Sequence, residues 1–333
     1  MQKHSNLENK ILKLLNTEVM EERAKIPKKI MFELTNLCDL KCQFCSTHIS
    51  KRKKGFMEFD FFKRVIDEAM NLGIEECALF TTGESFLHPE VMKFIDYSSQ
   101  FDLYTYISTG GRCLSEELMD QILSSGLKSI KFSIDAGNEE TYKIIKGCDV
   151  SLDNLHHTIK YLYKSRNEMK SDLNIYGSYA ISEGNENEID KFMEKFFPIM
   201  DDVFFKFVGY SGLKLFKERK LGSELRKKYF IVENNEHSPC PLLWERFIVQ
   251  LDGSLTICCP DYENQFVYGD LKKESLQAAW NNETIKSFRN EMIEGKYDKL
   301  KFCSSCEGTR SKRAGLLKEF NHYTKKKWHQ FKK

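Results

Sequence analysis

The chain has 333 residues, of which 41% are hydrophobic and 30% are charged, a composition typical of a soluble globular protein with a large core. Its net charge of +2 gives no whole-chain reason to expect nucleic-acid binding, and no apolar run approaches the roughly 20 residues of a membrane span. Residues 1–29 lack the apolar stretch of a signal peptide, so we expect a cytoplasmic protein.

Strand and helix patterns alternate through residues 28–210, after a polar helical extension over residues 1–27. A short apolar strand is predicted at residues 30–34. Further strands are predicted at residues 77–80, 103–108, 129–134, 174–181 and 203–208, and helices at 57–72, 89–99, 115–125, 139–145, 152–169 and 186–197. This order predicts an α/β fold with a parallel sheet and crossover helices. No Rossmann or P-loop glycine motif follows a strand.

The first strand runs directly into a loop with Cys38, Cys42 and Cys45, spaced C-x3-C-x2-C. Clustered cysteines in a cytosolic chain favour metal binding or catalysis over disulfide bonds. Three thiolates on one loop can hold three irons of a four-iron cluster and leave the fourth iron open to a small molecule. A structural zinc site has similar spacings but needs a fourth ligand nearby, for which only His48 is available.

Unusual polar sequences follow the next strands of the predicted sheet. They are residues 82–85 (Thr-Gly-Glu-Ser), 108–111 (Ser-Thr-Gly-Gly) and 133–135 (Ser-Ile-Asp). Function in parallel sheets lies at the carboxyl ends of the strands, where all these sequences fall. Ordinary turn chemistry explains each one alone. Their coincidence beside three cysteines indicates a functional edge.

Residues 236–309 have a different pattern, after a linker helix predicted for residues 211–235. Residues 246–251 and 254–258 predict a β-hairpin, with Asp252-Gly253 favouring a type I′ turn. One helix is then predicted over residues 276–288. The thiols of this region are Cys240, the adjacent pair Cys258 and Cys259, and Cys303-x2-Cys306. Four of them would suit either zinc or a four-iron cluster.

The tail, residues 310–333, contains nine Lys or Arg against one acidic residue. Charged runs are mostly solvated faces, so we expect a terminal helix with its basic side in water. A sharper hypothesis is that the tail binds an anionic partner, such as an acidic substrate or flavodoxin. Cys77, Cys113 and Cys148 stand alone, and each is most simply a small buried hydrophobic residue.

Residues 28–210 resemble the core of the radical S-adenosylmethionine enzymes, whose hallmark is C-x3-C-x2-C after the first strand. The resemblance implies a partial (β/α)6 TIM-like barrel. It also implies a [4Fe-4S] cluster held by Cys38, Cys42 and Cys45, with S-adenosylmethionine chelating the open iron through its amino and carboxylate groups.

The same resemblance implies contacts to S-adenosylmethionine. Phe44 matches the family's residue beside the adenine, and the sequence that begins Thr82-Gly83-Glu84 matches the G-G-E-P motif that contacts the methionine amino group. A carboxylate suits an amine, because a charged acceptor strengthens the hydrogen bond. Residues at positions that often bind the ribose or methionyl end are Ser108, Ser133 and Asp135.

Some positions depart from the family pattern. Thr82 replaces the first Gly and Ser85 the Pro of the motif, and residues 109–111 read Thr-Gly-Gly in place of the commoner T-N-G. Lys146 stands where relatives often have Arg. The loop geometry and any carboxylate contact at Lys146 are therefore left open.

Residues 236–309 are similar to the SPASM/twitch extension, in its shorter twitch form with one auxiliary [4Fe-4S] cluster. The resemblance implies four ligands, which are Cys240, Cys258, Cys303 and Cys306. Cys258 is preferred because the family's D-G-x-V-x-x-C pattern falls on it, and Cys259 is the reserve ligand. A fully ligated cluster leaves no site for substrate, so we expect it to accept or relay an electron.

The resemblance implies that a flavodoxin or ferredoxin-type reductant supplies an electron to the cluster. The reduced cluster then cleaves S-adenosylmethionine to a 5′-deoxyadenosyl radical, which takes a hydrogen atom from the substrate. Twitch relatives include an aminocyclitol dehydrogenase. Peptide modifiers often have an N-terminal leader-binding domain of about 80 residues, whereas 29 residues precede the first strand here. We therefore expect oxidation of a small-molecule substrate, such as a sugar or cyclitol.

Three alternatives remain at this point. The first is oxidation or crosslinking of a peptide or protein. The second is epimerisation, with Cys148 as a conceivable hydrogen donor. The third, from another functional class, is a non-catalytic iron–sulfur electron carrier, which would explain the cysteines but not the polar edge of the sheet.

Overall fold

The computed structural model of the protein describes residues 22–182, 184–207 and 239–306. The linker helix predicted for residues 211–235 and the basic tail lie outside the described residues, as does nearly all of the predicted N-terminal helix. Among the described residues, no helix is both long and apolar enough to cross a membrane.

Six parallel strands form one part of a nine-stranded sheet with the order β6-β5-β4-β3-β2-β1-β7-β8-β9. The parallel strands are β1 (Lys29–Phe32), β2 (Glu76–Ala78), β3 (Tyr104–Thr109), β4 (Ser129–Ser133), β5 (Asn174–Ile181) and β6 (Asp202–Phe207). The helices between them are α2 (Phe59–Asn71), α3 (Val91–Ser98), α4 (Glu116–Ser124), α5 (Glu139–Lys146), α6 (Leu152–Met169) and α7 (Ile189–Phe196), with 3-10 turns at Ser85–Leu87, Glu186–Glu188 and Phe197–Ile199. The predicted α/β fold, a partial barrel of six parallel strands, is confirmed.

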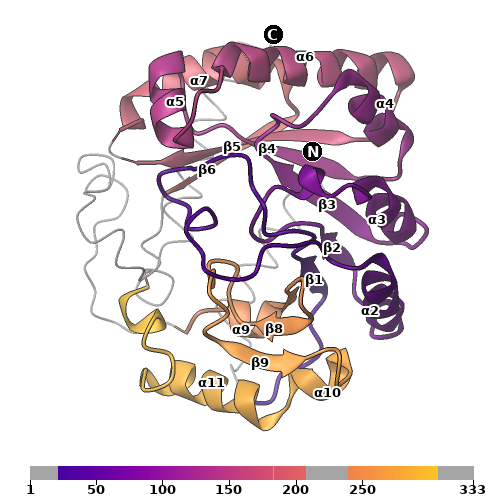
Figure 1. Ribbon diagram of the computed structural model, residues 1–333, viewed down its shortest axis with the longest axis vertical. Coiled ribbons are helices and arrows are strands. Elements are labelled where there is room, and N and C mark those ends of the chain that lie inside the picture. Colours follow the sequence, from indigo (N-terminus) through magenta and orange to yellow (C-terminus); the bar gives the residue numbers. More distant parts are fainter. Residues whose placement is uncertain (1–21, 183, 208–238, 307–333) are drawn as a thin grey trace, which may run out of the picture.

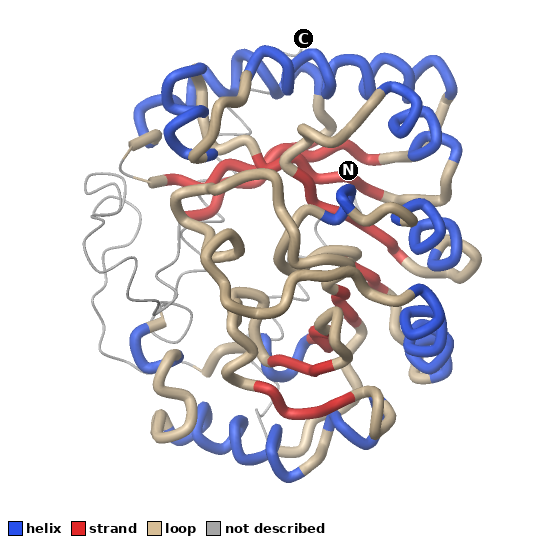
Figure 2. The backbone as a smooth tube through the Cα atoms, viewed as in Figure 1, coloured by secondary structure: helices blue, strands red, loops and turns tan. Residues whose placement is uncertain are grey.

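Helices cover the convex side of the sheet, and loops occupy its concave side (Figures 1 and 2). Successive residues of a strand point to opposite faces. Along β4, Ile130 and Phe132 are fully buried in the main hydrophobic core, together with Leu155 of α6, whereas Lys131 and Ser133 on the other face are only partly buried. Each large apolar side chain buried in this way contributes about 1.5–3 kcal/mol. The core therefore lies under the helices and leaves the concave face for polar groups.

The C-terminal part extends the same sheet. Strand β7 (Arg246–Val249) pairs in parallel with β1, so that Met31 lies beside Ile248. Strands β8 (Ser254–Thr256) and β9 (Val267–Asp270) continue the sheet in antiparallel fashion. The other elements of this part are α9 (Leu242–Glu245), α10 (Leu276–Trp280), α11 (Glu283–Glu294) and a 3-10 turn at Cys303–Ser305. The pairing places the second set of cysteines beside the edge of the barrel.

The single helix predicted over residues 276–288 is wrong, because the structure has two helices there. Asn282 begins α11 as its N-cap: its Oδ1 accepts hydrogen bonds from the backbone N–H groups of Thr284 (3.0 Å) and Ile285 (3.1 Å). An Asn in this position satisfies the unpaired donors of a helix start and breaks the preceding helix. The helical spacing of apolar residues continues on both sides of Asn282, so the sequence pattern did not show that one helix ends and another begins there.

The hairpin between β7 and β8 is confirmed, but its turn differs from the predicted type I′, which requires positive φ at both central residues. Only Gly253 has a positive φ, of 93°, and Asp252 does not. The backbone N–H of Gln250 donates to the carbonyl of Ser254 at 2.8 Å, which closes a three-residue loop with a left-handed glycine. The third strand, β9, was not predicted, because its four residues are too few to show an alternating pattern.

A buried carboxylate at the end of β1 joins the two parts of the protein. Glu33 is fully buried, and its oxygens accept two hydrogen bonds from the guanidinium of Arg52, at 2.9 and 2.6 Å. Glu33 also accepts hydrogen bonds from the hydroxyl of Thr82 and from the backbone N–H of Leu251, the latter at 3.2 Å. Arg52 in turn donates to the side chain of Gln250 at 3.2 Å. One carboxylate thus holds β1, the cysteine loop, the loop after β2 and the β7–β8 turn together.

Replacing this carboxylate tests its contribution to stability. We expect Glu33→Gln to lower the free energy of unfolding by about 3–5 kcal/mol, because it leaves the buried Arg52 guanidinium without its charged partner. Urea denaturation followed by circular dichroism, under anaerobic conditions, measures the change. The matched control is Glu75→Gln, which removes a surface ion pair between Glu75 and Lys28. The Glu75 side chain is 62% exposed and the Lys28 side chain is 58% exposed. This variant should cost less than about 1 kcal/mol, and equal losses in the two variants would contradict our view of Glu33.

Candidate functional site

The cysteine loop follows β1 and is closed at its base by side chains of its first residues. The hydroxyl of Thr35 donates to the carbonyl of Gly55 at 2.7 Å, and the amide of Asn36 donates to the carbonyl of Lys53 at 2.9 Å and accepts from the N–H of Gly55 at 3.0 Å. The Lys54 ammonium donates to the carbonyls of Asn36 and Thr47. A loop without regular secondary structure is thereby held in one shape.

The three thiols of this loop lie close to one another. The backbone N–H of Cys45 donates to the carbonyl of Cys42 at 3.0 Å, which forms the turn between them. Burial raises the pKa of Cys38 to about 12 and that of Cys42 to about 11, and neighbouring thiols of the same loop add to both shifts. Buried thiols become thiolates when a metal binds, since coordination removes the proton. The donor set therefore fits an iron centre.

The C-terminal end of α5 forms hydrogen bonds with the cysteine loop. The N–H groups of Lys41 and Gln43 donate to the carbonyls of Lys146 (3.0 Å) and Ile145 (2.8 Å). The next residue, Gly147, has φ of +65°, and a Cβ there would lie 2.2 Å from the carbonyl oxygen of Lys41. Only glycine permits this approach.

Asp135 and Lys146 form an ion pair beneath the loop. Both side chains are almost fully buried, and the ammonium of Lys146 lies 2.8 Å from one carboxylate oxygen of Asp135 and donates to the carbonyl of Ser133. The other oxygen of Asp135 accepts from the N–H of Ala180 at 2.7 Å, and its φ of +66° is unusual for a residue other than glycine. Both oxygens of Asp135 thus already accept hydrogen bonds from the protein. Its contact to S-adenosylmethionine stays a prediction.

The Thr82-Gly83-Glu84 sequence presses directly against the cysteine loop. Gly83 has φ of +75°, and a Cβ at this position would lie 2.2 Å from the carbonyl oxygen of Thr35. The N–H of Glu84 donates to the carbonyl of Leu37 at 2.7 Å, one residue before the first cysteine. The retained glycine is therefore required by close backbone packing.

The Glu84 carboxyl links the loops after β2 and β3. It accepts hydrogen bonds from the N–H of Gly110 (2.7 Å) and the N–H of Phe86 (3.3 Å). Burial raises the pKa of this carboxyl to about 7, although these hydrogen bonds lower it. Its charge also raises the pKa of Cys38, so the carboxyl lies near the thiols. A carboxyl that changes charge near neutral pH is thus placed beside the first cysteine set.

The remaining predicted contacts lie around this centre. Ser108 on β3 and Ser133 on β4 are partly buried and face the concave side. Phe44 lies between Cys42 and Cys45 and is also partly buried. The thiol of Cys148 is 3.5 Å from the carbonyl of Lys146, at the end of α5. Their roles stay predictions.

The C-terminal cysteines form a second group of thiols. The pKa of Cys258 is raised well above its ordinary value, first by burial and then by the charges of Cys259, Cys240, Cys306 and Cys303. Cys306 and Cys240 likewise raise the pKa of Cys303, whose shift to about 12 is due mainly to burial. The set predicted as auxiliary ligands is therefore close together, as a shared metal centre requires.

The adjacent Cys259 points elsewhere. Its sulfur lies 3.6 Å from the sulfur of Met31 on the concave face of β1. Besides burial, the charges of Cys240, Cys303 and Cys306 raise the pKa of Cys258, whereas the charges that act on Cys259 are those of Arg246, Lys131 and Lys206. This arrangement favours Cys258 over Cys259 as the auxiliary ligand.

Tyr262, which the sequence analysis did not single out, lies between the two groups of thiols. Its pKa is raised well above its ordinary value, mainly by burial, then by the charge of Cys45 and a hydrogen bond between the two side chains; Cys258 contributes further. The carbonyl of Tyr262 also accepts a hydrogen bond from the hydroxyl of Ser50, at 2.7 Å. No motif marks this residue, because its contacts join segments more than 200 residues apart.

Among the described residues, no three His, Cys, Asp or Glu side chains lie close enough together to hold a single metal ion. Zinc, with bonds of about 2.3 Å to sulfur, would hold its thiolates within about 4 Å of one another. A four-iron cluster binds each thiolate on a separate iron and spaces them more widely.

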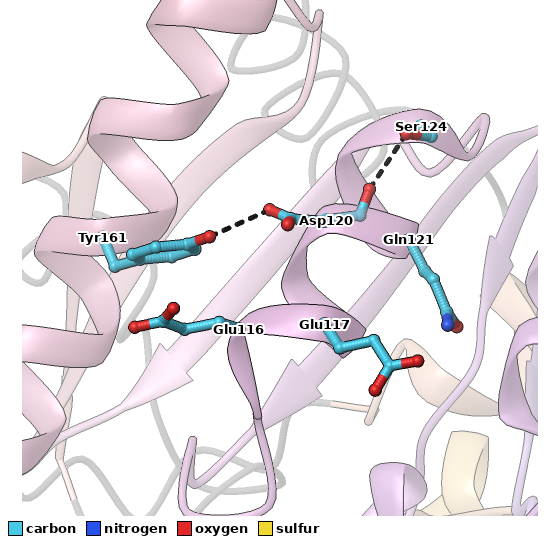
Figure 3. A pocket seen from close by; sticks show the side chains of 6 residues that line it. All are labelled: Glu116, Glu117, Asp120, Gln121, Ser124 and Tyr161. Atoms are coloured by element: carbon cyan, nitrogen blue, oxygen red, sulfur yellow. Dashed lines mark hydrogen bonds between the residues drawn. The ribbon is translucent and has the colours of Figure 1, made fainter.

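A pocket on the outer helices contains none of the predicted site residues (Figure 3). It lies between α4 and α6, where the hydroxyl of Tyr161 donates to Asp120 at 3.2 Å and Glu116 and Glu117 lie nearby. Its lining is acidic and lies on the convex side of the sheet, away from both groups of thiols. We assign it no function.

Two protein families match the chain. Residues 32–196 match the Radical SAM superfamily, and residues 240–307 match SPASM, an iron–sulfur cluster-binding domain. The first match contains the cysteine loop and the loops after β2, β3 and β4. The second contains all four cysteines that the sequence analysis assigned to an auxiliary cluster.

Solved structures share the fold. BtrN in complex with AdoMet and 2-DOIA is 18% identical, with a TM-score of 0.55, and the match covers 86% of this chain and 94% of BtrN. Streptococcus suis SuiB bound to precursor peptide SuiA is 15% identical, with a TM-score of 0.63, over 94% of this chain and 74% of SuiB. The enzyme anSMEcpe with bound AdoMet and Cp18Cys peptide is also 15% identical, with a TM-score of 0.60, over 92% of this chain and 99% of the other.

Relatives of described activity match shorter segments. The AdoMet-dependent heme synthase of Methanosarcina barkeri is 27% identical over 50% of this chain and 46% of its own length. A PqqA peptide cyclase of Granulibacter bethesdensis is 29% identical over 34% of this chain and 31% of its own length. The chain thus spans less than half the length of these relatives. The family matches, the shared fold and the two groups of thiols show that the chain belongs to the radical SAM superfamily, whose [4Fe-4S] cluster and S-adenosylmethionine it binds, and that it has a C-terminal SPASM domain for an auxiliary iron–sulfur cluster.

Proposed function

We propose that the chain is a radical SAM oxidoreductase that oxidises a small polar substrate, such as a sugar or cyclitol. The observation that carries this proposal is the position of the two groups of thiols on either side of one residue. Tyr262 interacts with Cys45 of the first group and with Cys258 of the second. A substrate on the concave face would therefore lie near both centres.

In this proposal, Cys38, Cys42 and Cys45 hold the first cluster, and Cys240, Cys258, Cys303 and Cys306 hold the auxiliary one. When bound, the first cluster and S-adenosylmethionine supply a radical that removes a hydrogen atom from the substrate, and the auxiliary cluster supplies a one-electron acceptor. A substrate that loses a hydrogen atom, a proton and an electron is oxidised by two electrons, as in the conversion of an alcohol to a ketone.

The protein's own groups bind and orient the reactants. Glu84 accepts a hydrogen bond from the amino group of S-adenosylmethionine. The close packing of Gly83 on Thr35 holds the Glu84 carboxyl at the cysteine loop. The partly buried Phe44, Ser108 and Ser133 line the surroundings of the cofactor. Burial of this region excludes water, which strengthens each polar contact.

The substrate class is supported by similarity to BtrN, whose structure contains 2-DOIA and whose length is matched at 94%. A second candidate function is peptide modification, because SuiB and anSMEcpe share the fold and were crystallised with peptides. Transfer of deuterium from a labelled candidate substrate into 5′-deoxyadenosine would distinguish the two. The label would come from a sugar or cyclitol in the first case and from a peptide in the second.

The reaction class can be tested without knowing the substrate. We expect the anaerobically reconstituted full chain, given dithionite and S-adenosylmethionine, to form 5′-deoxyadenosine, because the open iron makes the cofactor cleavable. Liquid chromatography measures the product. The triple variant Cys38→Ala/Cys42→Ala/Cys45→Ala is the control, and wild-type product no higher than in this variant would leave the electron-carrier alternative in place.

The choice between the adjacent cysteines predicts different iron contents. Two clusters correspond to about eight irons per chain. We expect Cys258→Ala to lower this to about four, because it removes a ligand of the auxiliary cluster. Cys259→Ala, the matched control, should leave the iron content unchanged. Iron and sulfide analysis of anaerobically reconstituted protein measures both, and the reverse result would identify Cys259 as the ligand.

The raised pKa of Glu84 predicts a pH dependence for cofactor binding. With a pKa of about 7, the carboxyl is mostly neutral at pH 6 and mostly charged at pH 8. Because a carboxylate accepts an N–H bond better than a carboxylic acid, S-adenosylmethionine should bind more tightly as the pH rises through 7. We expect Glu84→Gln to bind about tenfold more weakly at pH 8 and to lose this dependence. Equilibrium dialysis with reconstituted protein measures both; the control is Glu90→Gln on the surface.

A further inference from the structure

Two lysines face the concave side of the sheet without a charged partner. Lys131 on β4 and Lys206 on β6 lie on the strands that flank β5, and their side chains alternate with residues buried under the helices. Lys131 is partly buried and Lys206 is exposed. Within the described part of the chain, neither ammonium forms an ion pair or a hydrogen bond. The ammonium of Lys131 instead lies 4.9 Å from the centre of the Phe80 ring.

Four carboxylates around this face have a cation of their own, whereas Glu84 at the cysteine loop accepts hydrogen bonds from backbone N–H groups. The pairs are Glu33 with Arg52, Glu76 with Lys29, Asp135 with Lys146, and Glu245 with Arg246. Lys131 and Lys206 have no such carboxylate partner among the described residues. The two lysines also repel each other: burial and then the charge of Lys206 lower the pKa of Lys131 to about 8, although Asp135 and Cys259 act in the opposite direction. Two cations placed together without a counter-charge cost stability unless an anion joins them.

A third cation borders the same space. The guanidinium of Arg246 lies 3.6 Å from the sulfur of Met31, and the sulfur of Cys259 lies at the same distance from it. One nitrogen of Arg246, Nε, is buried and has no hydrogen-bond partner among the described residues. Phe80 and Tyr106 meet edge to face at 5.7 Å and form an aromatic wall beside it. The concave face therefore combines unmatched donors with apolar surface, as an oriented ligand requires.

We propose that Lys131 and Lys206, with Arg246 at the border, bind an anionic group of the substrate, a phosphate or a carboxylate, on the concave face beside the two groups of thiols. The inference rests on the proposed function and narrows its substrate class from polar to anionic. Lysine and arginine both bind phosphate and carboxylate through charge-assisted hydrogen bonds. The anion relieves the repulsion between the two lysines and holds the rest of the substrate near the aromatic wall.

Protection from chemical modification tests the site directly. The anaerobically reconstituted full chain is treated at pH 8 with an amine-reactive reagent in the presence of glucose 6-phosphate, glucuronate or neutral glucose, and modification of each lysine is followed by mass spectrometry. We expect glucose 6-phosphate, glucuronate or both to slow modification of Lys131 and Lys206 at least fivefold, and glucose to have no effect. Lys160, exposed on α6, is the internal control and should not change.

The two charged probes distinguish phosphate from carboxylate. Protection by one of them alone assigns the group, and protection by both indicates a general anion site. Equal protection by glucose, or no protection by either anion, would overturn the proposal. In the variants Lys131→Gln and Lys206→Gln, the dissociation constant of the protecting anion should rise about tenfold, and in Lys160→Gln it should not change.

The outcome is separable from that of the proposed function. Wild-type protein that forms 5′-deoxyadenosine but shows no anion protection refutes the anion site alone. Protein that is protected by anions but forms no 5′-deoxyadenosine refutes the radical reaction alone. Weaker binding in the two lysine variants, with normal iron content, separates loss of the anion contact from misfolding.

Discussion

The arrangement of the site depends on one buried carboxylate, Glu33, at the end of β1. A charge removed from water is stable only when its oxygens are fully satisfied. Here the partners are Arg52 of the cysteine loop, Thr82 of the loop after β2 and the backbone of Leu251 in the β7–β8 turn. Because each partner belongs to a different segment, the requirement to satisfy one charge fixes their relative positions.

The same kind of contact fixes the positions of the cysteines. The loop that contains Cys38 is held at its base by Asn36, on one side by Gly83 and on the other by the end of α5 at Gly147. Strand β7 pairs with β1 in the same sheet, so the second group of thiols is carried to the edge of the barrel. The two groups of thiols thereby both lie near Tyr262, which is affected by the charges of Cys45 and Cys258.

Much of the fold was predictable, because helix and strand periodicities are local. The strand predicted at residues 174–181 matches β5, and the helix predicted at 152–169 matches α6. The failures are also local in cause: Asn282 ended a helix whose apolar spacing continued, and four-residue β9 was too short to recognise. Cys258 and Cys259 could be ranked only by family pattern, until the direction of each side chain was known.

Chain spacing alone predicts that Cys38, Cys42 and Cys45 share one loop, because they lie within eight residues of one another. The alternation of strand and helix patterns was enough to predict a parallel sheet and to place the polar sequences at the carboxyl ends of its strands. The tertiary structure decided which charges are matched. Asp135 pairs with Lys146, whereas Lys131 and Lys206, which are 75 residues apart in sequence, lie on the two strands that flank β5 and have no ion-pair partner among the described residues. Charge balance is a property of space rather than of sequence, because electrostatic energy depends on the distance between groups and on their exposure to water.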